Sequence, residues 1–219
     1  MKTDAETFQT IDDVHVGDVA SESAAGTHEM RVLAFAATIS RHSINRQLLD
    51  YAARLLEDEH DVRVDFLDLN DYEMPIYSTD RQNENGIPAE AHDFFERIGA
   101  ADALLISFAE HNGFYTAAYK NVFDWASRID MRVFQDKPTV MLSTSPGRNG
   151  GANVLRTAVE SGVFFGNDVL ASLAIPSFTR NFDAATGRII DPDLDAALRR
   201  TTATLPAARA SIMSRHGHP

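Results

Sequence analysis

Short apolar runs and longer amphipathic segments alternate along most of this chain. The short runs are rich in β-branched and aromatic residues, a composition typical of buried strands. They predict five strands, over Val32–Ala36, Val62–Leu67, Ala103–Phe108, Thr139–Ser143 and Val169–Ile175. The longer segments repeat apolar residues at helical spacing. They predict helices over Ser43–Leu56, Ala89–Ile98, Thr116–Arg128, Ala152–Ser161 and Asp193–Met213, the last interrupted at Pro206.

The third and fourth predicted strands are almost entirely apolar, which indicates a parallel sheet covered by helices on both faces. Right-handed crossovers between parallel strands then give a doubly wound α/β fold. The commonest order for five such strands is 2-1-3-4-5, and we predict this flavodoxin-like order here. In such a sheet the ligand binds outside the carboxyl ends of the strands, near the switch point between the first and third. The loops that follow the strands are therefore the candidate site.

The first 30 residues differ in composition from the rest of the chain. They carry about half of the net charge of −12, because seven acidic residues stand against the single Lys2. The stretch from Ser21 to Thr27 has no core-forming pattern, so we expect residues 1–30 to be an acidic, flexible extension. The apolar positions from Ile11 to Val19 leave a short strand or docking segment as an alternative. Residues 31–219 are expected to form one domain.

Composition excludes several classes of function. The net charge of −12 and the absence of a basic cluster argue against a nucleic-acid partner. The chain has no cysteine, which excludes disulfides, thiolate metal sites and cysteine nucleophiles. No apolar run approaches the roughly 20 residues that span a bilayer. We therefore expect a cytoplasmic protein with no membrane contact and no metal site.

Polar residues gather directly after the first predicted strand. Thr38, Ser40, Ser43 and Asn45 occupy the turn between this strand and the next helix. Free backbone N–H groups and the helix dipole favour an anion at such a turn. Because neither a GxGxxG nor a GxxxxGK[ST] motif is present, the pattern favours a phosphate site built from hydroxyl groups. Ordinary helix capping uses the same N–H groups and is compatible with it.

The loop after the third strand carries Glu110, His111, Asn112 and Gly113. This polar block could present backbone amides and carbonyls to the edge of a flat polar ring. A plain loop in which Gly113 adopts a positive φ is the simpler alternative. A hydrolytic site with Glu110 and His111 as acid and base is a third, but no nucleophile or metal ligands lie at a suitable spacing.

Two further segments follow strands. The loop after the fourth strand contains Ser145, Gly147, Gly150 and Gly151, and its glycines would let the backbone approach a ligand closely. After the second strand, the turn Pro75–Tyr77 is apolar and aromatic. It could cover a planar ligand, pack against a partner subunit or simply anchor on the core.

With these loops assembled, the chain resembles the NAD(P)H-dependent FMN reductase family of flavodoxin-like proteins. The family pattern Gly-Ser-x-Arg-x-x-Ser-x-Asn corresponds to residues 37–45, which read Ala-Thr-Ile-Ser-Arg-His-Ser-Ile-Asn. The family's Pro-Glu-Tyr-Asn corresponds to Ala-Glu-His-Asn at 109–112, and Lys-Asn-x-x-Asp-Trp is found at 120–125. A Ser-x-Ser loop ending in Gly-Gly spans 143–151, and Pro-Ile-Tyr at 75–77 is similar to the family's Pro-Leu-Tyr.

This resemblance implies a two-electron oxidoreductase. Hydride would pass from NADPH or NADH to N5 of FMN, and a quinone, azo compound, free flavin or similar acceptor would then take the electrons. No side chain is needed as acid or base for hydride transfer, so no catalytic residue is predicted. The helix of residues 120–125 would mediate a homodimer or homotetramer. The implied FMN contacts are Thr38, Ser40, Ser43, Asn45, Pro75, Tyr77, Glu110, His111, Asn112, Gly113, Ser145, Gly147, Gly150 and Gly151.

Three positions depart from the family pattern. Ser40 replaces the arginine of the phosphate loop, Ala37 replaces its first glycine, and His111 replaces a tyrosine. Arg41 could substitute for the missing arginine, and Arg148 could favour the 2′-phosphate of NADPH. Two alternatives to a reductase remain: a flavin-binding electron carrier, although the Thr-x-Thr-Gly-x-Thr loop of carriers is absent, and a domain that has lost FMN.

Overall fold

The computed structural model describes residues 29–209, so the predicted extension over residues 1–30 lies almost entirely outside the described part. The strands are β1 Met30–Ala36, β2 Val62–Leu67, β3 Ala103–Phe108, β4 Lys137–Thr144 and β5 Asn167–Ile175. All neighbouring pairs are parallel, and the order is β2-β1-β3-β4-β5. The predicted α/β fold and strand order are confirmed.

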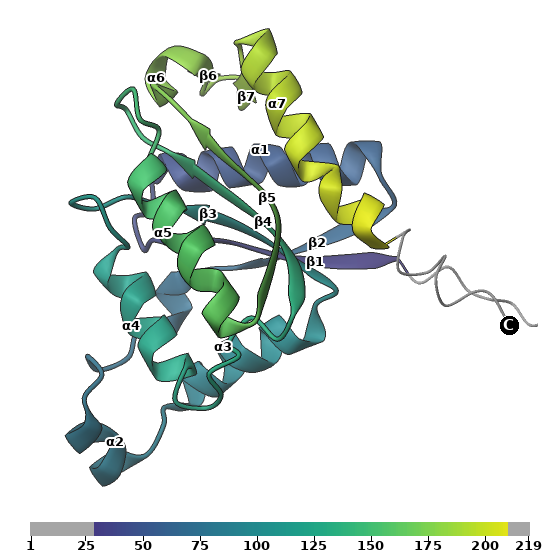
Figure 1. The fold of residues 1–219 in the computed structure, drawn as a ribbon. Helices are drawn as coiled ribbons and strands as arrows, with labels where there is room; N and C mark the ends of the chain where they lie inside the picture. Colours follow the sequence, from purple (N-terminus) through teal and green to yellow (C-terminus); the bar gives the residue numbers. More distant parts are fainter. Residues whose placement is uncertain (1–28, 210–219) are drawn as a thin grey trace, which may run out of the picture.

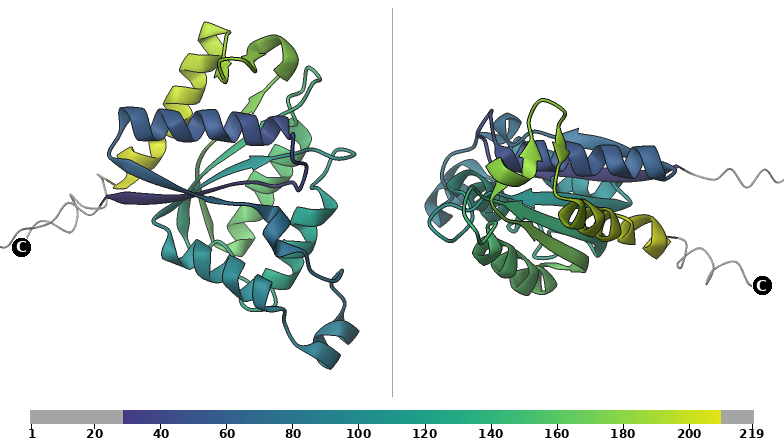
Figure 2. Two further views of the ribbon diagram at one scale, coloured as in Figure 1. Left: turned by 180° about the vertical axis from the view of Figure 1, so that it is seen from behind. Right: turned by 90° about the horizontal axis from the view of Figure 1, so that it is seen from above.

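Helices cover both faces of this sheet. They are α1 Ile44–Glu59, α2 Thr79–Asn85, α3 Ala89–Ala100, α4 Ala117–Ala126, α5 Ala152–Gly162, α6 Phe178–Asn181 and α7 Pro192–Thr202, with short 3-10 turns η1 Leu69–Tyr72 and η2 Val163–Phe165. Helices α1 and α7 lie on one face, while α3, α4 and α5 lie on the other (Figures 1 and 2). The short helix α2 projects from the body of the molecule at one corner (Figure 2, left).

The two faces of the sheet contribute to two separate apolar cores. In β1, Leu33 and Phe35 pack toward α3, α4 and α5, whereas Val32 and Ala34 pack toward α1 and α7. This alternation follows from the pleat, which sends successive side chains to opposite faces. A strand buried on both faces must therefore be almost entirely apolar, and β1 and β3 each contain a single polar residue, Arg31 and Ser107.

Three features of the fold differ from the sequence prediction. Helix α2 was not predicted, because it has no buried residue and therefore no apolar periodicity. The two-residue strands β6 Phe182–Asp183 and β7 Arg188–Ile189 are too short to produce a pattern. The C-terminal helix breaks at a turn at Ala203, not at Pro206. Pro206 lies within the first turn of the helical segment that follows, where a missing N–H is tolerated.

The Pro75–Tyr77 turn is fixed to the middle of α4. The side-chain amide of Asn121 donates to the carbonyls of Met74 and Pro75, at 3.0 and 3.2 Å, and accepts from the N–H of Tyr77 at 2.9 Å. The indole of Trp125 donates to Pro75 O at 2.7 Å. Hydrogen bonds thus join the Lys-Asn-x-x-Asp-Trp segment to the Pro-Ile-Tyr turn, so Asn121 and Trp125 have a structural role.

Asp124 of α4 pairs with a lysine on its own helix. Asp124 and Arg128 stand at the spacing that favours pairing on a helix. Instead, Lys120 binds both oxygens of Asp124, at 2.6 and 2.8 Å. The guanidinium of Arg128 lies over the ring of Tyr77, 5.9 Å from its centroid. Arg128 therefore contacts the ring of Tyr77, and Asp124 is paired with Lys120.

Candidate functional site

The loops after β1, β3 and β4 meet at the carboxyl edge of the sheet, as Figure 1 shows. In the sheet register Ala36 stands beside Ser107, and Phe108 stands beside Ser143, so the three strands end at nearly the same level. The N–H of Ala37 donates to Ser107 O at 2.8 Å, and the hydroxyl of Thr116 donates to Ala37 O at 2.9 Å. The structure therefore brings together the three loops that the sequence singles out.

The side chain of Asn45 links the start of α1 to the ends of β3 and β4. Its Oδ1 accepts from the hydroxyl of Ser107 at 3.0 Å and from the N–H of Thr144 at 2.9 Å. Its Nδ2 donates to Thr144 O at 3.0 Å, and the residue is only 3% exposed. The amide of Asn45 is thus engaged in hydrogen bonds within the protein. Asn45 therefore positions the loops, and its predicted contact with FMN stays a prediction.

The turn after β1 has the features of an anion site. Ser43 caps α1, because its Oγ accepts from the N–H groups of Asn45 and Arg46 at 3.2 and 3.4 Å. The N–H groups of Ile39, Arg41 and His42 have no hydrogen-bond acceptor within residues 29–209. Capping and anion binding are therefore compatible here, because the Ser43 cap uses two N–H groups and leaves these other three without an acceptor.

A cavity of about 530 Å³ opens beside this turn. Thr38, Ser40 and Arg41 line it from the turn, and Arg46 and Asp68 line it from α1 and from the end of β2. The N–H of Asn70, together with the charges of Arg46 and Arg41, holds the pKa of Asp68 below its usual value. The contribution from the end of β2 was not predicted, because Asp68 and Asn70 belong to no recognisable motif.

The loop after β3 forms a tight turn closed by two backbone hydrogen bonds. The N–H of His111 donates to Phe114 O at 3.0 Å, and the N–H of Phe114 donates to His111 O at 3.1 Å. Asn112 and Gly113 have φ of 55° and 78°, as a type I′ Asn-Gly turn requires. The expected positive φ of Gly113 is confirmed. The N–H groups of Asn112 and Gly113 have no acceptor in the described part of the chain.

Glu110, at the start of this turn, has a structural role that was not predicted. Its Oε2 accepts from the N–H groups of Asn153 and Val154, both at 3.0 Å, at the N-terminus of α5. The N-cap of this helix is Gly151, which has no side chain to cap it. Glu110 supplies the missing acceptor and a charge that suits the helix dipole. A carboxylate engaged in this way does not suit the acid–base alternative, and the contact of Glu110 with FMN stays a prediction.

The glycines after β4 permit close approach within the protein. A Cβ on Gly150, whose φ is 60°, would lie 2.7 Å from Ile175 O. A Cβ on Gly151, whose φ is 79°, would lie 3.1 Å from Ser143 Cβ. Both glycines are buried, whereas Gly147 is exposed and Ser145 half-buried, and the FMN contacts of these residues stay predictions.

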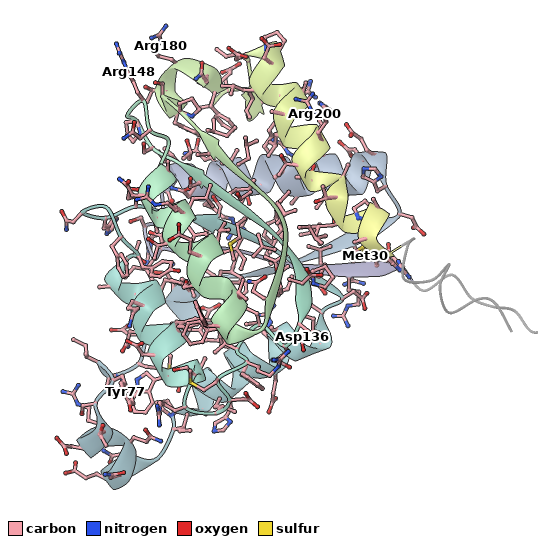
Figure 3. All side chains as sticks on the ribbon, in the orientation of Figure 1. Met30, Tyr77, Asp136, Arg148, Arg180 and Arg200 are labelled. Atoms are coloured by element: carbon pink, nitrogen blue, oxygen red, sulfur yellow. The ribbon has the colours of Figure 1, made fainter. Side chains whose placement is uncertain are left out.

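The Pro75–Tyr77 turn reaches the site through a residue that was not predicted. Tyr77 packs against Trp125, with ring centroids 5.0 Å apart, and lies beside α2, away from the three loops (Figure 3). A cavity of about 310 Å³ is lined by Ile39 of the first loop and Ile76 of the turn. These side chains are 50% and 76% exposed. Ile76 therefore lies beside the first loop, and the FMN contacts of Pro75 and Tyr77 stay predictions.

Comparison with known proteins agrees with this geometry. The sequence profile of the NADPH-dependent FMN reductase family matches residues 30–180. The chain belongs to this family. Among its relatives is a probable NADPH:quinone oxidoreductase from Oryza sativa subsp. japonica, 29% identical over 85% of this chain and 95% of the relative. An NAD(P)H-dependent FMN reductase from Pseudomonas aeruginosa is 31% identical over 74% of this chain and 86% of the relative.

A solved structure shares the fold. A flavoenzyme NAD(P)H:(acceptor) oxidoreductase from Paracoccus denitrificans superposes with a TM-score of 0.64 and 22% identity, covering 81% of this chain and 96% of that one. The family match confirms the predicted family, the oxidoreductase class, and FMN with NAD(P)H as the cofactors of that family. The individual contact residues stay predictions. None of the helices within residues 29–209 has the length and hydropathy needed to cross a membrane.

Replacement of Asn45 by alanine is expected to destabilise the protein strongly. The change leaves the N–H and carbonyl of Thr144 and the hydroxyl of Ser107 buried without partners, for a loss of about 2–4 kcal/mol in the free energy of unfolding. Urea unfolding measures this loss. Asn85→Ala, at an exposed position on α2, is the control and should change stability by less than about 0.5 kcal/mol. Equal effects of the two substitutions would contradict the assigned role of Asn45.

Proposed function

We propose that this protein transfers two electrons from NAD(P)H, through bound FMN, to a quinone, an azo compound, free flavin or a similar small acceptor. The observation that carries the proposal is the set of backbone N–H groups without acceptors, in the described structure, on the loops after β1 and β3. They converge at one sheet edge in a member of the NADPH-dependent FMN reductase family. A quinone is the first acceptor to test, because relatives carry the name NADPH:quinone oxidoreductase.

The turn after β1 would hold the phosphate of FMN. The free N–H groups of Ile39, Arg41 and His42 lie at the positive end of the α1 dipole, where a dianion is stabilised. The hydroxyls of Thr38 and Ser43 accept hydrogen bonds from the backbone and can still donate their own protons. This cluster of N–H and hydroxyl donors fits a phosphate group well.

The turn after β3 would hold the polar edge of the flavin ring. In its type I′ geometry the N–H groups of Asn112 and Gly113 have no acceptor within residues 29–209. Because the closing hydrogen bonds fix the turn in advance, these donors would not need to reorganise when negative charge develops on the ring edge. The negative charge of Glu110 is directed into α5 and leaves this edge free.

We also propose a homodimer or homotetramer assembled through the face formed by α4, α5 and η2. A cavity of about 210 Å³ lies on this face, among Phe114, Tyr119 and Phe165. Val163 and Phe164 of η2 are 72% and 79% exposed. Large exposed apolar side chains around an aromatic cavity are typical of a protein interface. The cytoplasm remains the proposed compartment, since NAD(P)H is generated inside cells.

The first experiment tests for FMN and for the reductase activity together. Protein reconstituted with FMN is expected to be yellow, to lose its flavin absorbance when NADPH is added without oxygen, and to recover it when a quinone is added. Absorbance spectroscopy follows all three steps. Colourless protein that excess FMN does not reconstitute would contradict the proposal. Flavin that stays oxidised in the presence of both NADPH and NADH would favour the electron carrier instead.

Arg41 is expected to replace the arginine that the family has at position 40. It lines the same cavity as Thr38 and Ser40 and has no ion-pair partner among residues 29–209. Arg41→Ala should raise the Kd for FMN roughly tenfold, the usual effect of losing one charge-assisted contact. Titration of the apoprotein with FMN, followed by flavin fluorescence, measures this Kd.

Two further variants complete that test. Ser40→Arg in the Arg41→Ala background should restore FMN affinity, because it returns a guanidinium to the family position. Arg63→Ala, at an exposed position of β2, should leave affinity unchanged. An unchanged Kd for Arg41→Ala would mean that backbone and hydroxyl groups hold the phosphate without an arginine.

Phe164→Glu should dissociate the proposed oligomer. A charge at a site that is 79% exposed in the single chain would be buried at the interface. We expect light scattering to give a dimer or tetramer for the natural protein and a smaller species for the variant, with the same urea midpoint for subunit unfolding. Ile190→Glu, at a residue that is 58% exposed before α7, is the matched control and should not change the mass. A monomeric natural protein would refute the proposal.

A further inference from the structure

Two arginines project from neighbouring loops at the β5 side of the site. Arg148 belongs to the loop between β4 and α5, and Arg180 belongs to α6. Figure 3 shows both side chains extending from the same corner of the molecule. The N–H of Ser177 donates to Gly147 O at 2.9 Å, and the N–H of Arg180 donates to Ser177 O at 2.8 Å. These hydrogen bonds hold the two arginine backbones close together.

Neither guanidinium has a carboxylate partner in the described structure. Several other arginines are paired, as Arg46 is with Asp50 at 2.6 Å and Arg199 is with Asp195 at 2.7 Å. Arg148 and Arg180 are exposed and form no ion pair or hydrogen bond through their side chains within residues 29–209. Acidic residues outnumber basic ones by 32 to 20 in this chain. Two adjacent, uncompensated arginines are therefore an unusual local concentration of positive charge.

The position of this pair indicates what it could bind. The same loop supplies Ser145 and Gly147 to the proposed FMN site, so the arginines lie at the rim of that site. The proposed phosphate turn after β1 lies beyond β3 and β4 from β5 in the sheet order. One anionic group would thus be held on the β1 side, and the β5 side would remain available for a second.

We propose that Arg148 and Arg180 form a clamp for the 2′-phosphate of NADPH and make the protein prefer NADPH to NADH. This inference rests on the proposed function. A guanidinium presents paired N–H donors that match phosphate oxygens, and two of them can share a dianion. NADH has a hydroxyl at that position and offers nothing for two positive charges to bind. Discrimination therefore resides in these two side chains.

Steady-state kinetics of the FMN-loaded protein tests the clamp. Arg148→Ala and Arg180→Ala should each lower the ratio of kcat/KM for NADPH to that for NADH roughly tenfold, and the double variant should lower it further. FMN content is measured in every variant, so that loss of FMN is not mistaken for loss of selectivity. The control is Arg200→Ala, an exposed and unpaired arginine on α7, away from this corner (Figure 3). It should leave the ratio unchanged.

A binding measurement tests the clamp without any catalysis. Calorimetric titration should show that the natural protein binds 2′,5′-ADP more tightly than 5′-AMP, and that the double variant binds the two equally. This result can be obtained even if the protein fails to reduce FMN, which separates the clamp from the proposed function. An unchanged NADPH-to-NADH ratio in the double variant would overturn the inference. Inorganic phosphate that binds as tightly as 2′,5′-ADP would also overturn it, since the arginines would then be a general anion site.

Discussion

The buried amide of Asn45 is the interaction on which the rest of the site depends. It lies where α1 begins and bonds to the ends of β3 and β4, so one side chain sets the relative positions of three loops. Parallel strands carry their loops at one edge, but the sheet ladder stops before that edge is reached. Beyond the strand ends, side chains must provide the hydrogen-bond partners of the backbone N–H and carbonyl groups. Asn45 could have bound a ligand, but its side chain instead holds the loops of the site in place.

Glu110 and the buried glycines extend this arrangement to α5. Gly150 must be a glycine, because a side chain there would meet the backbone at Ile175, and a positive φ then carries the chain into the helix through Gly151. The helix is left without a local cap, and Glu110 supplies one from the next loop. The start of α5 is thus held by a residue of the neighbouring loop. Donors fixed in this way keep their geometry before a ligand arrives, which is the basis of electrostatic preorganisation.

The sequence predicts the fold well because buried strands leave an unambiguous apolar signal, and strands buried on both faces require parallel pairing. It also locates the site, since the fold places every strand-end loop at one edge. The sequence cannot tell which side chains bind the ligand, because an asparagine or glutamate in a loop can hydrogen-bond to a ligand or to the backbone equally well. Only the packing decides that Asn45 and Glu110 bind protein, that Ile76 lies beside the first loop, and that Asp124 pairs with Lys120. Helix α2 was not predicted because it buries nothing.

Charge is distributed at this edge in a way that suits an anionic cofactor and donor despite the net charge of −12. The carboxylates near the loops are engaged: Glu110 caps α5, Asp50 pairs with Arg46, and Asp68 caps the turn that follows β2. The guanidinium of Arg41 and the pair on the β4 and β5 loops carry no such partner within residues 29–209. An acidic surface would repel a phosphate at long range, but screening limits that effect to about 10 Å in ordinary salt. Within that distance the unpaired arginines and free N–H groups dominate, so local geometry decides what this edge can bind.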